Sequence, residues 1–530
     1  MPIARYSAAS PEVTFDRYGT YWQLVAAAAE LHPSRVILLD QHGRSLTNRE
    51  LRDAACATAA AFAEAGIGQG SVVSWQLPTT LETMVVMVAL TRLGAVQNPI
   101  VPMLRENEVD FITGQVAAEF VLVPQIWRGF DHGALARALA VRHGFGVIVL
   151  DHETPPSVGT LRLPSGDLSA LPDPPAPSAQ TRWIYYSSGT TAAPKGIRHS
   201  DRSVLASTAG VVGMVGANSD DVNPLAFPIS HIGGATMLAS GLLTGMQLVL
   251  FDAFDPSTTP AAIAAHNPTF LGSATPFFVA FMAAQADHGA SPLFPTLRAC
   301  LAGGAPITPE LGRQVRETLA VPGVANAWGL TEFPVATSPR PDARPEVLDN
   351  TVGPTVPGVS VRVVDAKGVD VAVGEEGELR LKGPQCFLGY VDAALDADAF
   401  DPQGWFRTGD VGLLDSDGNV RVTGRIKDAI IRNAENISAL EVEGHLITHS
   451  GVADVAVIGV PDLLTGERVC AVVVSVPGRD VSLESLVEHC RSRGLSRHKY
   501  PERLELVDTL PRNLVGKVLK KELRSTFARP

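Results

Sequence analysis

The side chains best suited to chemistry lie together in residues 185–196, which read YYSSGTTAAPKG. Hydroxyl groups and glycine backbone can donate hydrogen bonds to phosphate oxygens, and a lysine ammonium can neutralise part of the phosphate charge. A turn of this composition is, by itself, more often an ordinary surface loop. The spacing also differs from the GxxxxGK[ST] loop of nucleoside triphosphatases, because Gly196 directly follows the lysine. The segment predicts a phosphate-binding loop of another kind, with these candidate residues: Ser187, Ser188, Gly189, Thr190, Thr191 and Lys195.

Lysine usage singles out two positions. Only eight of the 43 basic residues are lysines, and Lys195 is the only lysine in the first 366 residues. Compositional bias explains why lysine is scarce, but not which lysines remain. Lys517 stands in PRNLVGKVLKKELR, where a basic loop leads into a predicted helix. A compact ammonium on a flexible stem reaches phosphate or carboxylate oxygens where a planar guanidinium does not fit.

The elements that must position these residues alternate between strands and helices. Thr47 and Glu50 have the spacing of a capping box, which predicts a helix from there to about Gly66. A second helix is predicted over residues 81–95. This alternation is typical of an α/β fold with parallel sheets covered by helices. The predicted strands lie within residues 35–40, 71–78, 120–124, 147–150, 247–251 and 323–329, and TRWIYY predicts a further buried strand before the candidate loop.

A second, smaller domain is predicted near the C-terminus. After residues 404–428, short strands and DG turns give way to a compact mixture of strands and helices. Ser482 and Gly494 are suited to begin and end one of those helices. We expect an N-terminal domain over residues 1–424, a hinge over residues 425–427, and a mobile α+β C-terminal domain over residues 428–530, which is a plausible domain size.

Composition narrows the class of protein. The 530 residues, 45% of them hydrophobic and 18% charged, suffice for more than one core. A net charge of −12 without a basic run argues against a nucleic-acid partner. The five cysteines are far apart and form no CxxC pair, which favours a reducing cytoplasm. Neither a signal peptide nor an 18-residue apolar stretch is evident, while peripheral membrane contact and homodimer formation stay open.

Several separated segments match one family in order. They are YYSSGTTAAPKG, GGAP at 303–306, NAWGLTE at 326–332, TVGPTVPG at 351–358, GWFRTGD at 404–410, TGRIKD at 423–428 and PRNLVGK at 511–517. Over nearly its whole length the chain resembles the acyl-CoA synthetase branch of the adenylate-forming (ANL) superfamily. VVSWQLP, RLGAVQNPI, FPISHIGG and ATPFFVAFM further resemble ligases that act on cyclohexanecarboxylate, medium-chain or steroid-derived acids.

The resemblance implies a nucleotide site for ATP. The hydroxyl-rich loop would hold the β- and γ-phosphates, and Trp328, before Gly329, would pack on adenine opposite the backbone of Gly303, Gly304 and Ala305. Asp410 would accept hydrogen bonds from the ribose, and Arg425 would reach the ribose or the α-phosphate. Core packing is the alternative for Trp328, and a turn role is the alternative for Asp410.

The resemblance also implies the catalytic residues and the acid site. Thr190 and Thr331 would act near the phosphates, and Glu332 would help hold Mg²⁺, although a lone Thr-Glu pair is usually a helix N-terminus. Lys427 would be the hinge, and Lys517 would bridge carboxylate and α-phosphate oxygens. The implied acyl-pocket residues are His231, Gly233 and Gly234.

Three positions depart from the family pattern. Ala192 replaces a common glycine in the candidate loop, and Asp201 replaces a common histidine. Ala434 stands where relatives usually have glycine, in a loop near the thiol-transfer surface. If that position requires a positive φ, alanine would cost on the order of 1 kcal/mol. The second half-reaction is therefore the less certain one.

These observations predict an ATP- and Mg²⁺-dependent carboxylic acid:CoA ligase, an acid-thiol ligase of lipid or fatty acid metabolism. It would form an acyl-adenylate and pyrophosphate, then pass the acyl group to CoA and release AMP. Two alternatives stay open: an adenylating enzyme that uses a carrier protein or an amine as acceptor, and a non-catalytic relative that binds nucleotide or acyl groups. Substrate identity is not fixed by the sequence.

Overall fold

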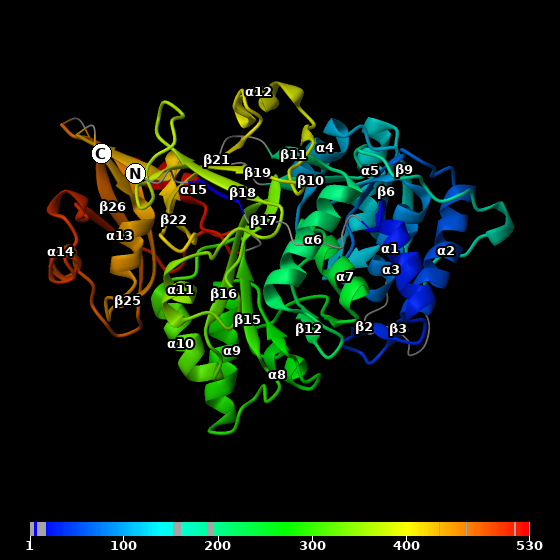
Figure 1. Cartoon of the computed structure of the whole chain (residues 1–530), viewed down its shortest axis with the longest axis horizontal. Coiled ribbons are helices and arrows are strands. Elements are labelled where there is room, and N and C mark those ends of the chain that lie inside the picture. The colour runs from blue at the N-terminus through cyan, green and yellow to red at the C-terminus, as the bar shows by residue number, and fades with distance from the viewer. Residues whose placement is uncertain are drawn as a thin grey trace.

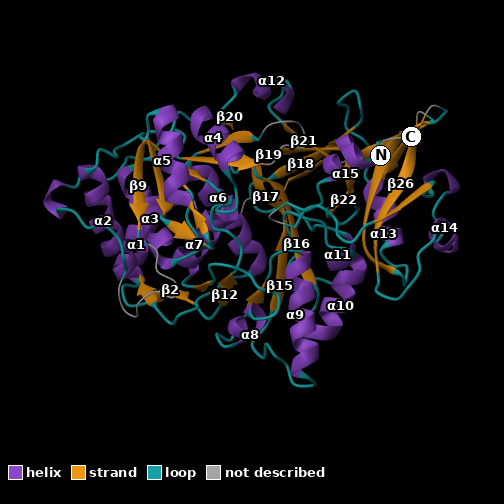
Figure 2. Ribbon diagram, turned by 180° about the vertical axis from the view of Figure 1, so that it is seen from behind, coloured by secondary structure: helices purple, strands orange, loops and turns teal. Residues whose placement is uncertain are grey.

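The computed structural model describes residues 5–7, 17–151, 161–187, 194–433, 435–462, 464–513 and 516–528. The C-terminal elements gather at one end of the long axis, and the largest sheet lies toward the other end (Figures 1 and 2). The α/β expectation is confirmed, with a large N-terminal part and a smaller C-terminal part.

The largest sheet has seven strands in the order β20-β11-β10-β5-β4-β6-β9. β10, β5, β4, β6 and β9 are parallel, while β11 and β20 run antiparallel to their neighbours. The predicted capping box is present, because Thr47 and Glu50 cap each other's backbone at the start of α2. The strands are β4 (Val72–Trp75), β5 (Val96–Pro99), β6 (Phe120–Pro124), β9 (Gly146–Leu150), β10 (Trp183–Ser187), β11 (Lys195–His199) and β20 (Gly389–Tyr390), and the helices that follow the chain here are α2 (Asn48–Glu64), α3 (Leu81–Leu93), α4 (Glu106–Gln115) and α5 (His132–His143).

A second sheet, ordered β12-β13-β2-β3, and a third, ordered β14-β15-β16-β17, continue the N-terminal part. Helices α6 and α7 pack side by side, and α6 also contacts β17 of the third sheet. The elements are α1 (Tyr21–Leu31), β2 (Val36–Asp40), β3 (Ser45–Thr47), α6 (Asp201–Val215), β12 (Val222–Leu225), α7 (Ile232–Thr244), β13 (Gln247–Leu250), α8 (Thr259–Ala264), β14 (Phe270–Leu271), α9 (Thr275–His288), β15 (Ala299–Gly303), α10 (Pro309–Leu319), β16 (Val324–Leu330), β17 (Phe333–Thr337) and α11 (Pro345–Asn350).

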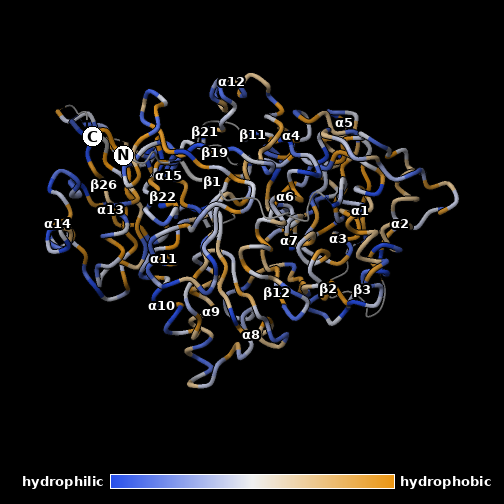
Figure 3. Tube along the Cα trace, viewed as in Figure 1, coloured by the Kyte–Doolittle hydropathy of each residue, from blue (hydrophilic) through white to orange (hydrophobic). Residues whose placement is uncertain are grey.

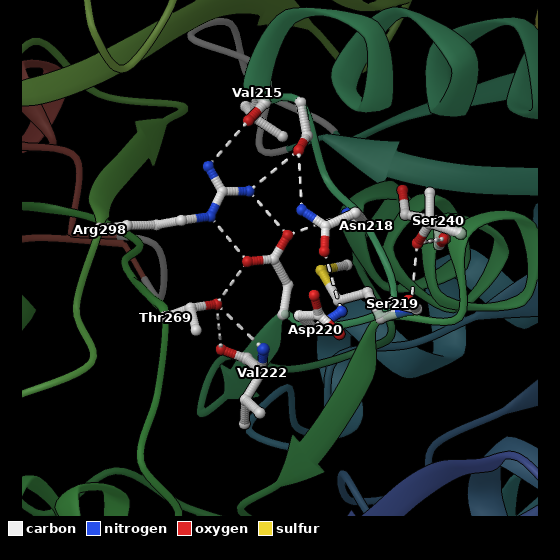
Figure 4. A network of polar contacts seen from close by, with 12 residues as sticks. Val215, Asn218, Ser219, Asp220, Val222, Ser240, Thr269 and Arg298 are labelled. Carbon is white, nitrogen blue, oxygen red and sulfur yellow. Dashed lines mark hydrogen bonds and ion pairs between the residues drawn. The ribbon is translucent and has the colours of Figure 1, made fainter.

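An ion pair between a buried carboxylate and a partly exposed guanidinium links these two sheets. Arg298, just before β15, donates from Nε and Nη2 to Asp221, just before β12, at 2.7 Å each. Arg298 also donates to the carbonyls that end α6, and Thr269 donates to Asp221 (Figure 4). Burial by itself would raise the pKa of Asp221, but Arg298 and the other donors outweigh it and the pKa is lowered. This ion pair therefore ties the end of α6 to the starts of strands β12 and β15.

The fourth sheet is antiparallel and carries the chain to the C-terminal part. Its order is β1-β18-β19-β21-β22. A core of valines, leucines and aromatic rings covers it, in which Phe387 packs against Phe400 and Phe406. Its elements are β1 (Arg5–Ser7), β18 (Ser360–Val364), β19 (Gly377–Lys382), β21 (Phe406–Leu414) and β22 (Val420–Arg425), with the short helix α12 (Asp396–Ala399) beside it.

The C-terminal part has its own five-stranded sheet and its own core. Hydrophobic residues follow its strands and hydrophilic ones follow α14 at the outside (Figure 3). The helix predicted after Ser482 is present as α14, and Gly494 beyond its end has a φ of +79°. The elements are β23 (Ala429–Arg432), β24 (Glu435–Ser438), α13 (Ala439–Leu446), β25 (Val452–Asp462), β26 (Gly466–Ser475), α14 (Leu483–Ser492), β27 (Arg503–Leu506) and α15 (Lys520–Phe527).

Two further expectations from the sequence concern membrane-spanning segments and cysteines. None of the helices in the described ranges is both long and apolar enough to cross a membrane. All five cysteines are free thiols, and three of them are buried.

Candidate active site

The predicted phosphate loop connects two paired strands. β10 and β11 are antiparallel, and Ser187 lies directly opposite Lys195. The connection therefore leaves and rejoins the large sheet at one point. Ser188, Gly189, Thr190, Thr191 and Ala192 lie outside the described residues, so their phosphate-binding roles stay predictions.

Lys195 and Glu332 are joined through a residue that sequence reasoning missed, Tyr390. The Lys195 ammonium lies 5.0 Å from the centre of the Tyr390 ring, and the Tyr390 hydroxyl donates to Glu332 Oε1 at 2.9 Å. Burial, reinforced by the Glu332 charge, raises the pKa of Tyr390, so the hydroxyl stays a donor. Tyr390 is 58 positions from Glu332, and no local spacing in the sequence relates the two.

Thr331 and Glu332 occupy the turn between β16 and β17, not a helix N-terminus. Gly329 makes this hairpin possible, because a Cβ there would lie 2.5 Å from the backbone nitrogen of Val335. Val335 itself has a φ of +49°, an unusual value for a β-branched residue. The turn that presents Thr331 and Glu332 is thus tightly constrained.

A buried histidine fixes the Thr331 backbone. His199 Nε2 lies 2.8 Å from the Thr331 carbonyl oxygen, which can only accept, so Nε2 carries the proton. Nδ1 then accepts from Ser203 Oγ at 3.0 Å. Burial lowers the pKa of His199 to about 4, although the bond to Thr331 opposes that shift. The imidazole is therefore neutral and acts as a positioning group.

The predicted adenine segment lies where two parallel strands end together. Gly303 pairs with Ala327 in β16, so residues 303–305 lie beside Trp328. Gly304 has a φ of +80°, where a side chain would be strained. Trp328 is 8% exposed and belongs to the core over the fourth sheet. Packing is thus part of its role, and its contact with adenine stays a prediction.

Asp410 has two side-chain partners, Trp328 in β16 and Arg425 in the neighbouring strand β22. Trp328 Nε1 donates to its Oδ2 at 2.8 Å, and Arg425 Nε lies 2.7 Å from its Oδ1 as an ion pair. Among the described residues, Oδ1 has no partner aligned for a hydrogen bond, so it can still accept one from a ligand hydroxyl. Burial raises the pKa of Asp410, while Arg425, Trp328 and Lys517 oppose the rise.

Lys517, in the C-terminal part, is coupled to this carboxylate by charge. Burial, together with the like charge of Arg425, lowers the pKa of Lys517 to about 8, and Asp428 and Asp410 oppose the shift. Neighbouring Gly516 packs against the N-terminal part, because a Cβ there would lie 3.4 Å from the ring of Pro276. A partly buried ammonium of the C-terminal part is thus coupled by charge to a buried carboxylate of the N-terminal part.

The predicted hinge segment is short and exposed. Lys427 lies in the single 3₁₀ turn Ile426–Asp428, between β22 and β23. Asp428 pairs with Arg524 of α15 at 3.3 Å, within the C-terminal part. The hinge role of Lys427 stays a prediction. Ala434 lies outside the described residues, while its neighbour Asn433 has a φ of +51°.

The acyl-pocket candidates cluster at the start of α7. His231 precedes the helix and lines a pocket that also includes Thr331. Burial lowers the pKa of His231 to about 4. Gly234 has a backbone reason to be glycine, since a Cβ there would lie 2.0 Å from the Ile229 carbonyl oxygen. Neither Gly233 nor Gly234 is among the residues that line this pocket.

Asp201, one of the departures from the family pattern, has a structural role. Its carboxylate accepts from Trp183 Nε1 at 2.9 Å and from the backbone N–H of Tyr21 at 3.1 Å. It thereby ties α6 to β10, the strand before the phosphate loop, and to α1. Burial raises the pKa of Asp201.

Glu332 is suited to a hard divalent cation. Within the described ranges, no group of three or more His, Cys, Asp or Glu side chains could hold a metal ion. Mg²⁺ does not need such a group, because it commonly uses one or two carboxylates together with substrate phosphates. The hydrogen bond from the Tyr390 hydroxyl orients Glu332 Oε1. Carboxylates that bind metal ions are usually held by a hydrogen bond of this kind.

The fold and this site define an adenylate-forming enzyme. The chain belongs to the AMP-binding enzyme family, whose family model matches residues 25–391. The family model of the AMP-binding enzyme C-terminal domain matches residues 441–517. The acyl-CoA synthetase branch of the superfamily is likewise supported, since relatives include CoA ligases.

Three comparisons illustrate the range of the family. The chain is 32% identical to a salicyl-AMP ligase / salicyl-S-ArCP synthetase of Mycobacterium tuberculosis, over 96% of this chain and 92% of that protein. It is 30% identical to a medium-chain fatty-acid–CoA ligase of Escherichia coli, over 96% and 90%. The structure matches ATP-bound MatB from Rhodopseudomonas palustris with a TM-score of 0.83 and 26% identity, over 96% and 99%.

Proposed function

We propose that the protein is an ATP- and Mg²⁺-dependent carboxylic acid:CoA ligase. In the first step a carboxylate oxygen attacks the α-phosphorus of ATP, and pyrophosphate leaves to give an acyl-adenylate. In the second step the CoA thiol attacks the acyl carbon, and AMP leaves. Residues 1–424 would bind ATP and the acid, residues 425–427 would act as the hinge, and residues 428–530 would move.

The observation that carries the first step is the pairing of Arg425 with Asp410 at 2.7 Å, with Lys517 close enough for both charges to shift its pKa. Negative charge on the α-phosphate and the carboxylate must be neutralised as they approach each other. An ammonium in a partly dry site does this more effectively than one in water. With a pKa of about 8, Lys517 is mostly protonated at neutral pH. Asp410 Oδ1, which is ion-paired with Arg425 but accepts no hydrogen bond among the described residues, suits a ribose hydroxyl.

The phosphate end of the nucleotide would be held from the other side. Lys195 and the loop after Ser187 would bind the β- and γ-phosphates. Glu332, oriented by Tyr390, would hold Mg²⁺ together with phosphate oxygens. The metal supplies charge neutralisation for the leaving pyrophosphate, and Thr331, whose backbone is fixed by His199, would lie near the α-phosphate.

The acceptor of the acyl group is the point on which relatives differ. The Escherichia coli relative is named as a CoA ligase, which supports CoA. The Mycobacterium tuberculosis relative is named as a salicyl-S-ArCP synthetase, which favours a carrier-protein thiol as the second candidate acceptor. The first step is common to both.

The test is ATP-dependent pyrophosphate release with and without CoA, over fatty, aromatic, alicyclic and steroid-side-chain acids. We expect release with one class of acid, and an acyl-CoA product only when CoA is added. Lys517→Ala should lower release by roughly 10²- to 10³-fold, whereas Lys367→Ala, in an exposed turn, should not change it.

Each departure from this result has a definite meaning. Release without a thioester would make CoA the wrong acceptor, and adding a carrier protein or an amine would identify the alternative. Nucleotide binding without release for any acid would contradict the ligase and favour a binding role.

A further inference from the structure

One wall of the pocket beside Thr331 is hydrocarbon. The pocket encloses about 370 Å³ of empty space, open solvent at its mouth included. Because that figure includes open solvent, the enclosed part is smaller than the roughly 300–1,000 Å³ typical of small-molecule sites. The space therefore suits a compact acid better than a long chain. The apolar lining residues are Pro99, Ile100, Val101, Leu104, Ile112 and Ile232.

The hydrocarbon wall is held in place from behind. Gln76 Nε2 donates to the Val101 and Leu104 carbonyls at 3.1 and 3.0 Å. Gln76 Oε1 in turn accepts from His132 Nδ1 at 3.0 Å. Buried hydrogen bonds of this kind hold a loop in one conformation. The pocket cannot widen on this side without breaking them.

Three polar atoms of the lining residues have no hydrogen-bond partner in the described part of the chain. Tyr185 and Ser230 are 2% and 3% exposed, and both line the pocket together with His231. Within the described part of the chain, the Tyr185 hydroxyl, Ser230 Oγ and His231 Nε2 are buried and make no hydrogen bond. By contrast, the hydroxyl of Tyr186, which also lines the pocket, donates to Gln115 at 2.6 Å.

Unpartnered polar atoms of this kind point to a ligand. A buried polar group without a partner costs about 1–3 kcal/mol, so native structures rarely keep several of them together. A substrate that supplies the partners recovers this cost when it binds. The nearby Asp201 carboxylate accepts from Trp183 Nε1 and from the backbone N–H of Tyr21, and these bonds leave the Tyr185 hydroxyl without a partner among the described residues.

The substituent that these atoms would recognise is uncharged. None of the described residues lining the pocket is Asp, Glu, Lys or Arg. Burial raises the pKa of Tyr185 and lowers that of His231 to about 4, so both groups are neutral near pH 7. A hydroxyl or a keto oxygen can pair with them, whereas a second carboxylate would remain without a counter-charge.

We propose that the acid substrate is compact and carries an uncharged hydrogen-bonding oxygen on its body, which Tyr185, Ser230 and His231 bind. A hydroxy- or keto-substituted ring acid has this chemistry, while an unsubstituted fatty acid does not. The inference rests on the proposed adenylation of a carboxylic acid. It adds that an uncharged oxygen substituent distinguishes the substrate from the corresponding acid without that oxygen.

The test compares matched acids by ATP–pyrophosphate exchange, which reports the first step alone. The pairs are benzoate with its three hydroxybenzoates, and cyclohexanecarboxylate with its hydroxy and keto derivatives; phthalate and terephthalate carry the charged substituent. We expect at least one oxygenated acid to exceed its parent in kcat/KM by about tenfold or more, because a site built to bind a hydroxyl rejects the analogue that lacks it. The diacids should be poorer than the parent.

Two variants locate the preference. Tyr185→Phe and Ser230→Ala should each reduce the ratio between oxygenated acid and parent by about tenfold or more. Tyr500→Phe, a matched control in the C-terminal part, should leave the ratio unchanged. Thermal unfolding without ligand provides the structural check: Tyr185→Phe should keep or raise Tm, because it removes a buried polar atom that has no partner.

The failures can be told apart. Exchange with plain acids at rates equal to or above those of their oxygenated partners would overturn this inference and leave the ligase in place. A Tyr185→Phe variant that folds and keeps the full ratio would also overturn it. Absence of exchange with every acid, for wild type that binds ATP, would overturn the proposed function itself and this inference with it.

Discussion

The pH dependence of adenylation gives the sharpest test of the interdomain site. Burial and Arg425 bring the pKa of Lys517 to about 8, against 10.5 in water. The charged lysine is needed for the first step, so activity should be full below that pKa and fall above it. At pH 9 about one tenth of the free enzyme would keep the proton, and kcat/KM for pyrophosphate exchange should be about tenfold below its plateau.

Two variants should shift the alkaline limb of the pH profile, where activity falls as Lys517 loses its proton, in opposite directions. Arg425→Gln removes the like charge that lowers the pKa of Lys517, so the limb should shift to higher pH even if the plateau drops. Asp428→Asn removes the opposite charge that raises that pKa, so the limb should shift to lower pH. The profiles are measured as kcat/KM for ATP at an acid concentration far below its KM, because kcat/KM then reports the free enzyme.

The profile of kcat provides a further check. Bound phosphates are negative and close to Lys517 in the proposed complex, so they should raise its pKa and move the kcat limb to higher pH. The reasoning would be refuted if wild type and both variants shared one limb, or if Arg425→Gln moved the limb to lower pH.

Three further predictions concern neighbouring features. Gly329→Ala should destabilise the fold by about 1–3 kcal/mol and slow pyrophosphate exchange by about 10²-fold. The added Cβ would lie 2.5 Å from the backbone nitrogen of Val335 and displace the turn that holds Thr331 and Glu332. Tm measures the first effect and the exchange rate measures the second. Tyr390→Phe should raise the Mg²⁺ concentration for half-maximal exchange by about 10- to 100-fold, because Glu332 loses its donor, while saturating Mg²⁺ should restore most activity. Arg298→Met should cost about 1–3 kcal/mol of unfolding free energy at pH 7, a value kept low because the Arg298 side chain is 37% exposed. Asp221 has a lowered pKa in the fold, so its contribution is present above its unfolded pKa and lost as pH falls through the folded one; urea unfolding at pH 7 and pH 3 should show the variant's deficit shrinking in acid.

Sequence patterns predicted the elements well wherever the signal is local. The capping box of Thr47 and Glu50, the strand before the phosphate loop, and the helix after Ser482 all depend on neighbours within a few residues. The order of strands within each sheet is not such a signal, because it depends on contacts between distant segments.

The site was predicted as a set of residues but not as a set of contacts. Tyr390 and Glu332 are 58 positions apart, and His199 and Thr331 are 132 apart, so no periodicity relates them. Trp328 illustrates a second limit, since its sequence context cannot distinguish a core residue from a ligand contact and the structure gives it a packed ring and a bond to Asp410. The pocket atoms of Tyr185 and Ser230 became visible only because burial and missing partners can be determined in three dimensions.

The partly buried ammonium of Lys517 has a consequence for how nucleotide and protons act on the molecule together. Holding that charge in the site disfavours this orientation of the C-terminal part by roughly 3 kcal/mol relative to the neutral amine, given a pKa of about 8. A ligand phosphate that neutralises the ammonium offsets this penalty, so ATP and a proton should bind with positive cooperativity through one side chain. Near pH 8.5, ATP binding should take up a fraction of a proton and pyrophosphate loss should release it. The lysine would then couple the chemical state of the nucleotide to the free energy that holds the two parts together.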